Sequence, residues 1–284
     1  MDSEPKRDRP AFPDDWTVEH AVEIADTPAG TVYELTLRDG SLAIAKHLKR
    51  KVLEDSQRGA DFLKWRSGIG CVRLLDRTHD LLLMEHAGRE TLRDLLLREG
   101  DEAATRIAIE VLLNYHQSSD LPPPQSLLTL PRYFESLFRK AQQDRNQGAV
   151  SIYTEAAATA EHLIANQRNF RPLHGDLHHE NIMNSHRGWT IIDPAGLIGD
   201  AALDVANMFS NPLDRFDLTH NEERIASMAS LFAEALKRDE RTLLQYAFAY
   251  GCLSAAWHEE DSNTQDRDDE LTVAQAIRTV LSQF

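Results

Sequence analysis

Three polar side chains fall in one short stretch of the chain with a spacing that suits phosphoryl transfer. Asp176 and Asn181 lie in the run His-Gly-Asp-Leu-His-His-Glu-Asn that begins at His174, and Asp193 follows in Ile-Ile-Asp-Pro. A carboxylate can orient a substrate hydroxyl, while an amide and a second carboxylate supply the oxygen ligands that magnesium takes from proteins. We therefore expect Asp176 to act as the base, and Asn181 and Asp193 to bind Mg²⁺.

A lysine near the start of the chain fits the nucleotide side of the same chemistry. Lys46 ends the apolar run Ala-Ile-Ala-Lys, from where its ammonium group can reach the α- and β-phosphates of ATP. Its expected partner is an acid of the following helix. Glu54, Asp55 and Asp61 are available there, and Glu54 is preferred. The order lysine, aspartate with asparagine, then aspartate matches the order found in kinases.

Two further segments would complete a nucleotide site. The turn 27–31, Thr-Pro-Ala-Gly-Thr, has one glycine where protein kinases have three. Its backbone amides and threonine hydroxyls, including that of Thr31, are expected to contact the phosphates. The Glu-His-Ala-Gly segment after Met84 has the form of a hinge between two lobes. We expect the adenine to bond to the Glu85 carbonyl and the Ala87 amide, with Met84 at the back of the pocket.

The histidines of the first run permit a different chemistry. His174, His178 and His179, together with the nearby aspartate, could bind zinc or a non-haem metal, as in a metal hydrolase. Gly175 and the polar residues between His174 and His178 disfavour the helix that would place both imidazoles on one face, so this is the weaker alternative. We expect His174 to brace the catalytic loop through hydrogen bonds, and His178 or His179 to line the substrate pocket.

The surrounding sequence predicts elements that would place these groups around one cleft. Short apolar runs between polar turns indicate an antiparallel sheet of five strands and one helix within the first 85 residues. The expected strands cover about residues 23–26, 32–37, 42–46, 72–75 and 81–84, with the helix at 51–65. Helices are expected at 104–115, 131–143, 151–166, 204–209, 222–237, 240–257 and 269–282, with a short hairpin within 181–192. The predicted fold class is α+β, with an N-lobe at 1–87, a hinge at 85–88 and a mainly helical C-lobe at 88–284.

The amino-acid composition limits the binding partners and the cellular location that we expect. Acidic residues outnumber basic ones 46 to 31, giving a formal net charge of −15. Such a field repels nucleic acid and anionic membranes and attracts cations. No stretch approaches the ~20 apolar residues that span a bilayer, and Cys71 and Cys252 are too scattered for a disulfide framework. We expect a cytoplasmic monomer that binds neither nucleic acid nor membrane.

With these residues in place, the chain resembles the aminoglycoside phosphotransferases, and within them the streptomycin 6-kinases grouped with the hydroxyurea phosphotransferases. The resemblance covers nearly the whole chain and rests on the segments 58–65, 72–75, 173–183, 192–194, 206–209 and 250–257. Arg-Gly-Ala-Asp in the first and Leu-Ser-Ala-Ala-Trp in the last are the most specific. The resemblance implies a bilobal protein-kinase-like fold, ATP, Mg²⁺ and transfer to the 6-hydroxyl of streptomycin's streptidine ring, which would confer antibiotic resistance.

The resemblance also assigns roles to particular residues. It gives the base role to Asp176 and metal ligation to Asn181 and Asp193, and it implies that Asp204 supports the catalytic loop without touching substrate. No helix glutamate stands out at the family's position as the partner of Lys46.

Acidic residues gather in two groups near the end of the chain. One group is Glu259, Glu260 and Asp261, and the other spans residues 266–270. Streptomycin carries two guanidinium groups, which bind carboxylates in bidentate pairs. We expect Glu259, Glu260 and Asp261 to contact the drug, and the acids from position 266 onward to form a solvated loop.

Two other functions remain open on the sequence alone. One is a kinase for another small hydroxyl or amine metabolite, hydroxyurea included. The other is a nucleotide-binding pseudokinase with a regulatory or scaffold role, which is disfavoured because Lys46, Asp176, Asn181 and Asp193 are all present.

Overall fold

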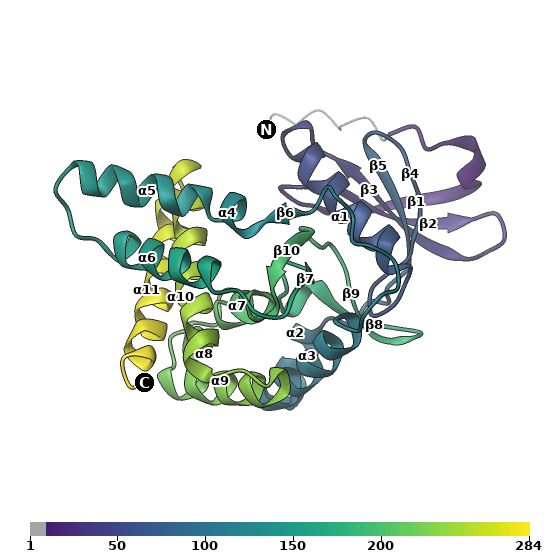
Figure 1. The fold of residues 1–284 in the computed structure, drawn as a ribbon. Helices are drawn as coiled ribbons and strands as arrows, with labels where there is room; N and C mark the ends of the chain where they lie inside the picture. The colour runs from purple at the N-terminus through teal and green to yellow at the C-terminus, as the bar shows by residue number, and fades with distance from the viewer. Residues whose placement is uncertain (1–9) are drawn as a thin grey trace, which may run out of the picture.

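Five strands pair into one antiparallel sheet at the start of the chain. The computed structural model describes residues 10–284. The strands are β1 (Val18–Asp26), β2 (Gly30–Leu37), β3 (Leu42–Leu48), β4 (Leu74–Arg77) and β5 (Leu81–Glu85), in the order β1-β2-β3-β5-β4. Helix α1 (Leu53–Arg66) connects β3 to β4 and lies beside the sheet (Figure 1).

The alternation of side chains along β3 and β5 decides where Lys46 points. Ala45 pairs with Leu83, and both lie in a small core on one face of the sheet with Trp16. Successive residues of a strand point to opposite faces, so Lys46, paired with Leu82, faces the other way. That face packs toward α1 and the main core, which explains why Lys46 is 4% exposed although it is charged.

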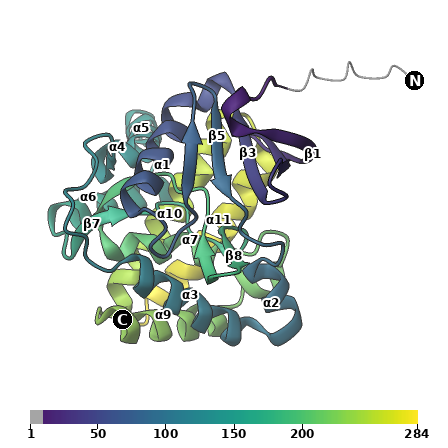
Figure 2. The same ribbon diagram turned by 90° about the vertical axis from the view of Figure 1, so that its right-hand side faces the viewer.

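The rest of the chain is mainly helical. Its helices are α2 (Leu92–Glu99), α3 (Asp101–Tyr115), α4 (Leu130–Tyr133), α5 (Glu135–Asn146), α6 (Ile152–Ala165), α7 (Ala206–Phe209), α8 (Phe216–Thr219), α9 (Glu222–Leu236), α10 (Glu240–Glu260) and α11 (Thr264–Leu281). Short strands form a sheet in the order β6 (Leu128–Thr129), β10 (Leu197–Asp200), β7 (Phe170–Leu173), and a hairpin of β8 (Ile182–Ser185) and β9 (Gly188–Ile191). Figure 2 shows the first sheet above this hairpin and α2.

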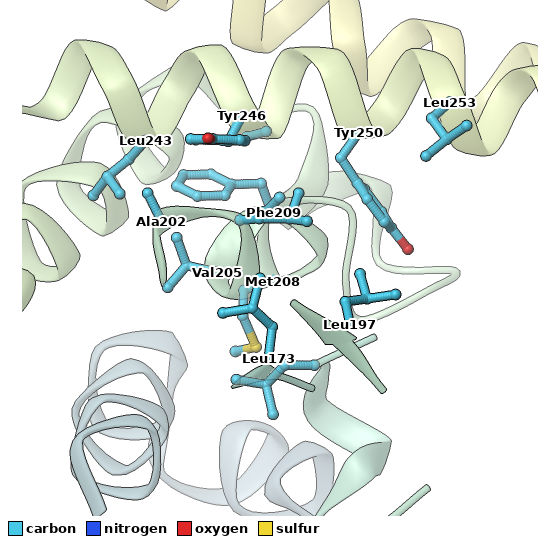
Figure 3. Packing of buried hydrophobic residues seen from close by; sticks show 14 of the residues in the cluster. Leu173, Leu197, Ala202, Val205, Met208, Phe209, Leu243, Tyr246, Tyr250 and Leu253 are labelled. Atoms are coloured by element: carbon cyan, nitrogen blue, oxygen red, sulfur yellow. The ribbon is translucent and has the colours of Figure 1, made fainter. Parts of the chain in front are cut away.

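The buried helix α10 organises the larger core. All residues from Leu243 to Ala256 except Gln245 are buried, and most of them are apolar, a pattern typical of a helix enclosed by others. Figure 3 shows Tyr246 of α10 above Phe209 of α7, with Leu173 and Leu197 further below. These contacts hold the end of β7 and the start of β10. The polar loops of the candidate site lie between these two points of the chain.

The predicted α+β fold, with a small antiparallel sheet and a larger helical region, is confirmed. The expectation of a solvated acidic loop after position 266 is wrong, because α11 begins at Thr264. The Asn263 side chain caps this helix by accepting from the Asp266 amide, and acids are stabilised in a first helical turn.

Helix α2 was not predicted from the sequence, although Thr91 and Asp94 form a capping box there. Within residues 10–284, no helix has the length and apolar character needed to cross a membrane.

Candidate active site

The loop after β7 is held from behind by His174. Its Nε2 lies 2.8 Å from the Ile192 carbonyl oxygen, and its Nδ1 accepts from the Asp176 amide at 3.1 Å. Burial lowers the pKa of His174, so its ring is neutral, with one donor and one acceptor nitrogen. The predicted bracing role is confirmed. The zinc alternative is not supported, because both ring nitrogens are occupied and residues 10–284 hold no cluster of three metal-ligating acids, histidines or cysteines.

Asp204 anchors the same loop from the short helix η4 (Ala201–Val205). Its carboxylate accepts from the Gly175 amide at 2.8 Å and from the His174 amide at 3.3 Å. Burial opposes ionisation of Asp204, but hydrogen bonds from His116 and Tyr115 hold its pKa below the usual range. Asp204 is 2% exposed and therefore supports the loop rather than meeting a substrate, as the resemblance implied.

The Asp176 carboxylate is partly exposed, and its two oxygens are held unequally. Its Oδ1 accepts from Asn207 Nδ2 at 2.8 Å, and its side chain is 44% exposed. Oδ2 is the more loosely held oxygen, at 3.5 Å from Asn181 Nδ2 and 3.9 Å from His178 Nε2. The sequence analysis did not assign Asn207 a role, although it lies in the quoted segment 206–209. A hydroxyl that reaches Oδ2 could donate its proton to a carboxylate whose orientation is already set.

Asn181 and Asp193 lie next to each other because the hairpin between them brings its ends together. Ile182 pairs with Ile191, and the Ile192 amide donates to the Asn181 carbonyl at 2.9 Å. Asn181 Nδ2 donates to the Asp176 carbonyl at 2.9 Å, which turns its Oδ1 away from that bond. One amide oxygen and one carboxylate are therefore presented together, which is the donor set that fits Mg²⁺.

The partner of Lys46 is Asp193, so the preference for Glu54 is wrong. Lys46 Nζ lies 2.5 Å from Asp193 Oδ1 and 2.6 Å from Oδ2. Glu54 is exposed in the first turn of α1. Asp55 pairs with a neighbouring arginine, and Asp61 bonds to Ser126 and Arg77, so neither is directed to the lysine. An acid was correctly expected as the partner, but the sequence could not reveal that it comes from the loop after β9.

The expected hinge packs on the β8–β9 hairpin. Met84 and Ala87 are buried, and the Glu85 carboxylate accepts from Arg187 and from the Arg73 amide. Gly88 has a positive φ of 87°, and a Cβ there would lie 2.1 Å from the Asn184 carbonyl oxygen. Only glycine suits this close approach.

The predicted phosphate contact of the Thr31 side chain lacks support. Its hydroxyl donates to Asp26 Oδ1 at 3.1 Å. The turn before it closes on itself, because the Thr27 amide donates to the Gly30 carbonyl at 2.9 Å. A turn this short uses its own polar groups to satisfy its backbone.

Comparison with known proteins decides the family. A model of the aminoglycoside/hydroxyurea antibiotic resistance kinases matches residues 15–262. The chain is also 34% identical to a streptomycin 3''-kinase from Klebsiella pneumoniae over 229 residues, which cover 78% of this chain and 82% of that protein. The chain therefore belongs to the family of aminoglycoside/hydroxyurea antibiotic resistance kinases. It is 26% identical to a streptomycin 6-kinase from Streptomyces griseus over 280 residues, covering 93% and 86% of the two chains.

Solved structures show that the kinase has a protein-kinase-like fold. The aminoglycoside phosphotransferase APH(4)-Ia, in a ternary complex with AMP-PNP and hygromycin B, superposes with a TM-score of 0.60 and covers 92% of this chain and 94% of its own at 12% identity. A choline kinase from Cryptosporidium parvum Iowa II gives a TM-score of 0.62 over 93% and 89% at 13% identity. At such identities the likeness concerns the fold.

The predicted place of His179 in the substrate pocket is wrong. His179 is fully buried in the short helix η3 (His179–Asn181), and burial lowers its pKa to about 3. The neighbouring His178 stays near the catalytic carboxylate, with Nε2 at 3.9 Å from Asp176 Oδ2 and Nδ1 at 3.0 Å from Glu180. The two adjacent histidines therefore differ in their surroundings: His179 is buried, whereas His178 lies near the Asp176 carboxylate. Their positions in the sequence did not predict this difference.

The first acidic group is occupied by bases of the kinase itself. Glu259 lies 2.9 Å from Lys140, Glu260 lies 2.8 Å from Arg139, and Asp261 lies 3.0 Å from Lys51. The three acids are therefore ion-paired within the protein, and their contact with the drug stays a prediction. Helix α5 lies beside the end of α10 and brings two of the bases, a proximity that is invisible in the sequence.

The second acidic group lines a cavity of about 280 Å³ between α8 and α11. Its wall contains the four acids Asp214, Asp266, Asp269 and Glu270, and also Ser210, Leu213, Phe216, Thr219, His258 and Val273. A larger open depression of about 660 Å³ lies at the turn between α9 and α10 and contains none of the candidate catalytic residues.

Glu270 is the unusual member of the acidic cavity. It is 9% exposed, its Oε1 accepts from Ser254 at 3.1 Å, and its Oε2 has no hydrogen-bond partner. Burial raises the pKa of Glu270 to about 7, the hydrogen bond from Ser254 opposes this rise, and the nearby aspartates add to it. Ser210 directly follows α7, whose Asn207 contacts the catalytic carboxylate. The cavity therefore begins within one helical turn of a residue that touches Asp176.

Proposed function

We propose that the protein is an ATP- and Mg²⁺-dependent kinase that transfers a phosphoryl group to a hydroxyl of streptomycin and so inactivates the antibiotic. One observation carries this proposal: a half-exposed, oriented Asp176 lies beside the paired oxygen ligands Asn181 and Asp193, with Lys46 directed to the same point. A phosphoryl transferase needs little more than such positioning and charge neutralisation.

Each residue of the site would have a separate role in the transfer. The more loosely held Oδ2 of Asp176 would orient the acceptor hydroxyl and receive its proton as the new oxygen–phosphorus bond forms and the bond to ADP breaks. Asn181 and Asp193 would hold Mg²⁺, which when bound neutralises charge on the phosphates. Lys46 would share its ammonium group between Asp193 and the nucleotide phosphates.

The nucleotide would lie between an N-lobe at 1–87 and a C-lobe at 88–284. Met84 would border the adenine, which would bond to the Glu85 carbonyl and the Ala87 amide of the hinge. In support, no hydrogen bond within residues 10–284 occupies the Ala87 amide, although this residue is buried. A buried amide without a partner is costly unless a ligand satisfies it.

The acidic cavity suits the acceptor. A guanidinium group stays positively charged at any physiological pH and binds carboxylates in bidentate geometry. Glu270 offers an unoccupied oxygen, with Asp266 and Asp269 on the same wall. A streptidine guanidinium in this cavity would bring that ring toward the end of α7, whose Asn207 contacts Asp176. The 6-hydroxyl is the acceptor that the sequence resemblance implies. The relative that is 34% identical is named a 3''-kinase, so the 3''-hydroxyl is the competing acceptor.

The decisive experiment incubates the protein with streptomycin, ATP and Mg²⁺ and analyses the drug by tandem mass spectrometry and ³¹P NMR. We expect the mass of one phosphoryl group to be added to the streptidine fragment. A phosphate on the amino sugar would show that the 3''-hydroxyl is the acceptor, and the proposed function as a streptomycin kinase would still hold. No modified streptomycin, alongside turnover of hydroxyurea or another small hydroxyl compound, would refute the proposed acceptor. An Asp176→Asn sample serves as the control for uncatalysed transfer.

A further inference from the structure

Helix α1 contacts the loop 193–196, which carries Asp193, through an arginine that bonds to the loop backbone. No acid of α1 makes this contact. Arg58 Nε donates to the Ala195 carbonyl at 3.0 Å, and the other end of its guanidinium pairs with Asp55 at 2.6 Å. The Arg58 side chain is 14% exposed, so this contact is largely shielded from water. Ala195 is two residues from Asp193, the loop's proposed metal ligand.

Two glycines allow the helix and the loop to touch. A Cβ on Gly59 would lie 2.1 Å from the Pro194 carbonyl oxygen, closer than any real Cβ contact. Gly196 has a φ of 74°, and a Cβ there would lie 2.9 Å from the Arg58 carbonyl oxygen. The glycine of the Arg-Gly-Ala-Asp segment is therefore required by the approach of the loop to α1, and not by a turn.

The other side of the loop is held by the catalytic loop. The Ala195 and Gly196 amides both donate to the His174 carbonyl, at 2.8 and 3.2 Å. Asp193 itself has a φ of 54°, a left-handed conformation that costs energy unless its surroundings enforce it. With its amides held by His174 and a carbonyl held by Arg58, the loop is clamped between the catalytic loop and α1.

We infer that Arg58 and Gly59 of α1 position Asp193 through the loop residues Pro194 and Ala195, in place of a helix acid that would act through Lys46. Arg58 is thus a positioning residue: it touches the loop and not the reactants. The metal and nucleotide named here rest on the proposed function, whereas the clamp itself does not.

A matched pair of substitutions isolates the Arg58 hydrogen bond. The Arg58→Met variant keeps the shape of the side-chain stem but has no donor, and the Arg58→Gln variant restores an N–H at the position of Nε without the charge. Lys64→Met, at an exposed position of the same helix, is the control for a change on α1. Thermal unfolding of each variant verifies that it folds.

Two measurements read the clamp without turnover. The first is hydrogen exchange of the peptide covering residues 193–196 in the protein alone. The second is binding of Mn²⁺ in the presence of AMP-PNP, followed by electron paramagnetic resonance. We expect Arg58→Met to exchange faster and to bind Mn²⁺ about tenfold more weakly, the effect of losing one largely buried hydrogen bond. Arg58→Gln should stay within about twofold of wild type, as should Lys64→Met.

Each alternative result is decisive. Wild-type exchange and Mn²⁺ binding in Arg58→Met would overturn the clamp. An Arg58→Gln variant as impaired as Arg58→Met would also overturn it, since the charge rather than the Nε bond would then matter. A wild-type protein that exchanges as expected but binds no Mn²⁺ with AMP-PNP would refute the proposed function and the metal part of this inference, and would leave the contact between α1 and the loop established.

Discussion

Glu270 gives the acceptor assignment a quantitative test through pH. Burial raises its pKa to about 7, so its carboxyl is mostly neutral below that pH and mostly ionised above it. A guanidinium pairs with the ionised form, so binding favours proton release and the affinity must rise with pH. With this pKa, the ionised fraction grows about tenfold from about pH 6 to about pH 8, and the KM for streptomycin should fall by about the same factor. The Glu270→Gln variant should bind the drug weakly at every pH and lose this dependence.

The assay measures initial rates of ADP release against streptomycin concentration across that pH range, with saturating ATP and Mg²⁺. Glu259→Gln is the contrasting variant, because Glu259 pairs with Lys140 outside the cavity and should keep the wild-type pH profile. If Glu270→Gln retains the wild-type dependence of KM on pH, or if Glu259→Gln alone abolishes it, the cavity is not the guanidinium site.

Three further variants test the catalytic loop and its support. Asp176→Asn should abolish transfer while AMP-PNP binding and the free energy of unfolding stay unchanged, and near-normal turnover would remove Asp176 from the base role. Asp204→Asn should lower the free energy of unfolding by about 3 kcal/mol in urea denaturation, because the buried charge that accepts from His116 and two loop amides is lost; an unchanged midpoint would contradict the anchoring role. Phe209→Ala, which empties a fully buried site under α10, should cost about 3–5 kcal/mol; a cost below about 1 kcal/mol would show that the core collapses around it.

The chemistry of the site was readable because its residues are close in sequence or follow a fixed chain order. Asp176, Asn181 and Asp193 needed only a loop and a hairpin between them, and the hairpin was predicted. The ion-pair partners that could not be predicted come from distant segments. Lys46 meets Asp193 across 147 positions, and Glu259 meets Lys140 through the packing of two helices. Periodicity predicts which face of an element is apolar, but it does not say which other element will cover that face.

Two segments that carry the family resemblance, Arg-Gly-Ala-Asp and Leu-Ser-Ala-Ala-Trp, both contact the surroundings of the candidate site. Arg-Gly-Ala-Asp lies in α1 and fixes the loop of Asp193, as argued above. Leu-Ser-Ala-Ala-Trp lies at the end of α10, where Ser254 donates to Glu270 of the acidic cavity. In the same segment the Trp257 ring packs edge-on against Tyr133 at 5.4 Å, and the Tyr133 hydroxyl donates to the Gly175 carbonyl at 2.7 Å, next to Asp176. One turn of helix thus contacts both the acceptor cavity and the catalytic loop. Because both contacts pass through this turn, a substitution that shifts it is expected to move the acidic cavity and Asp176 together.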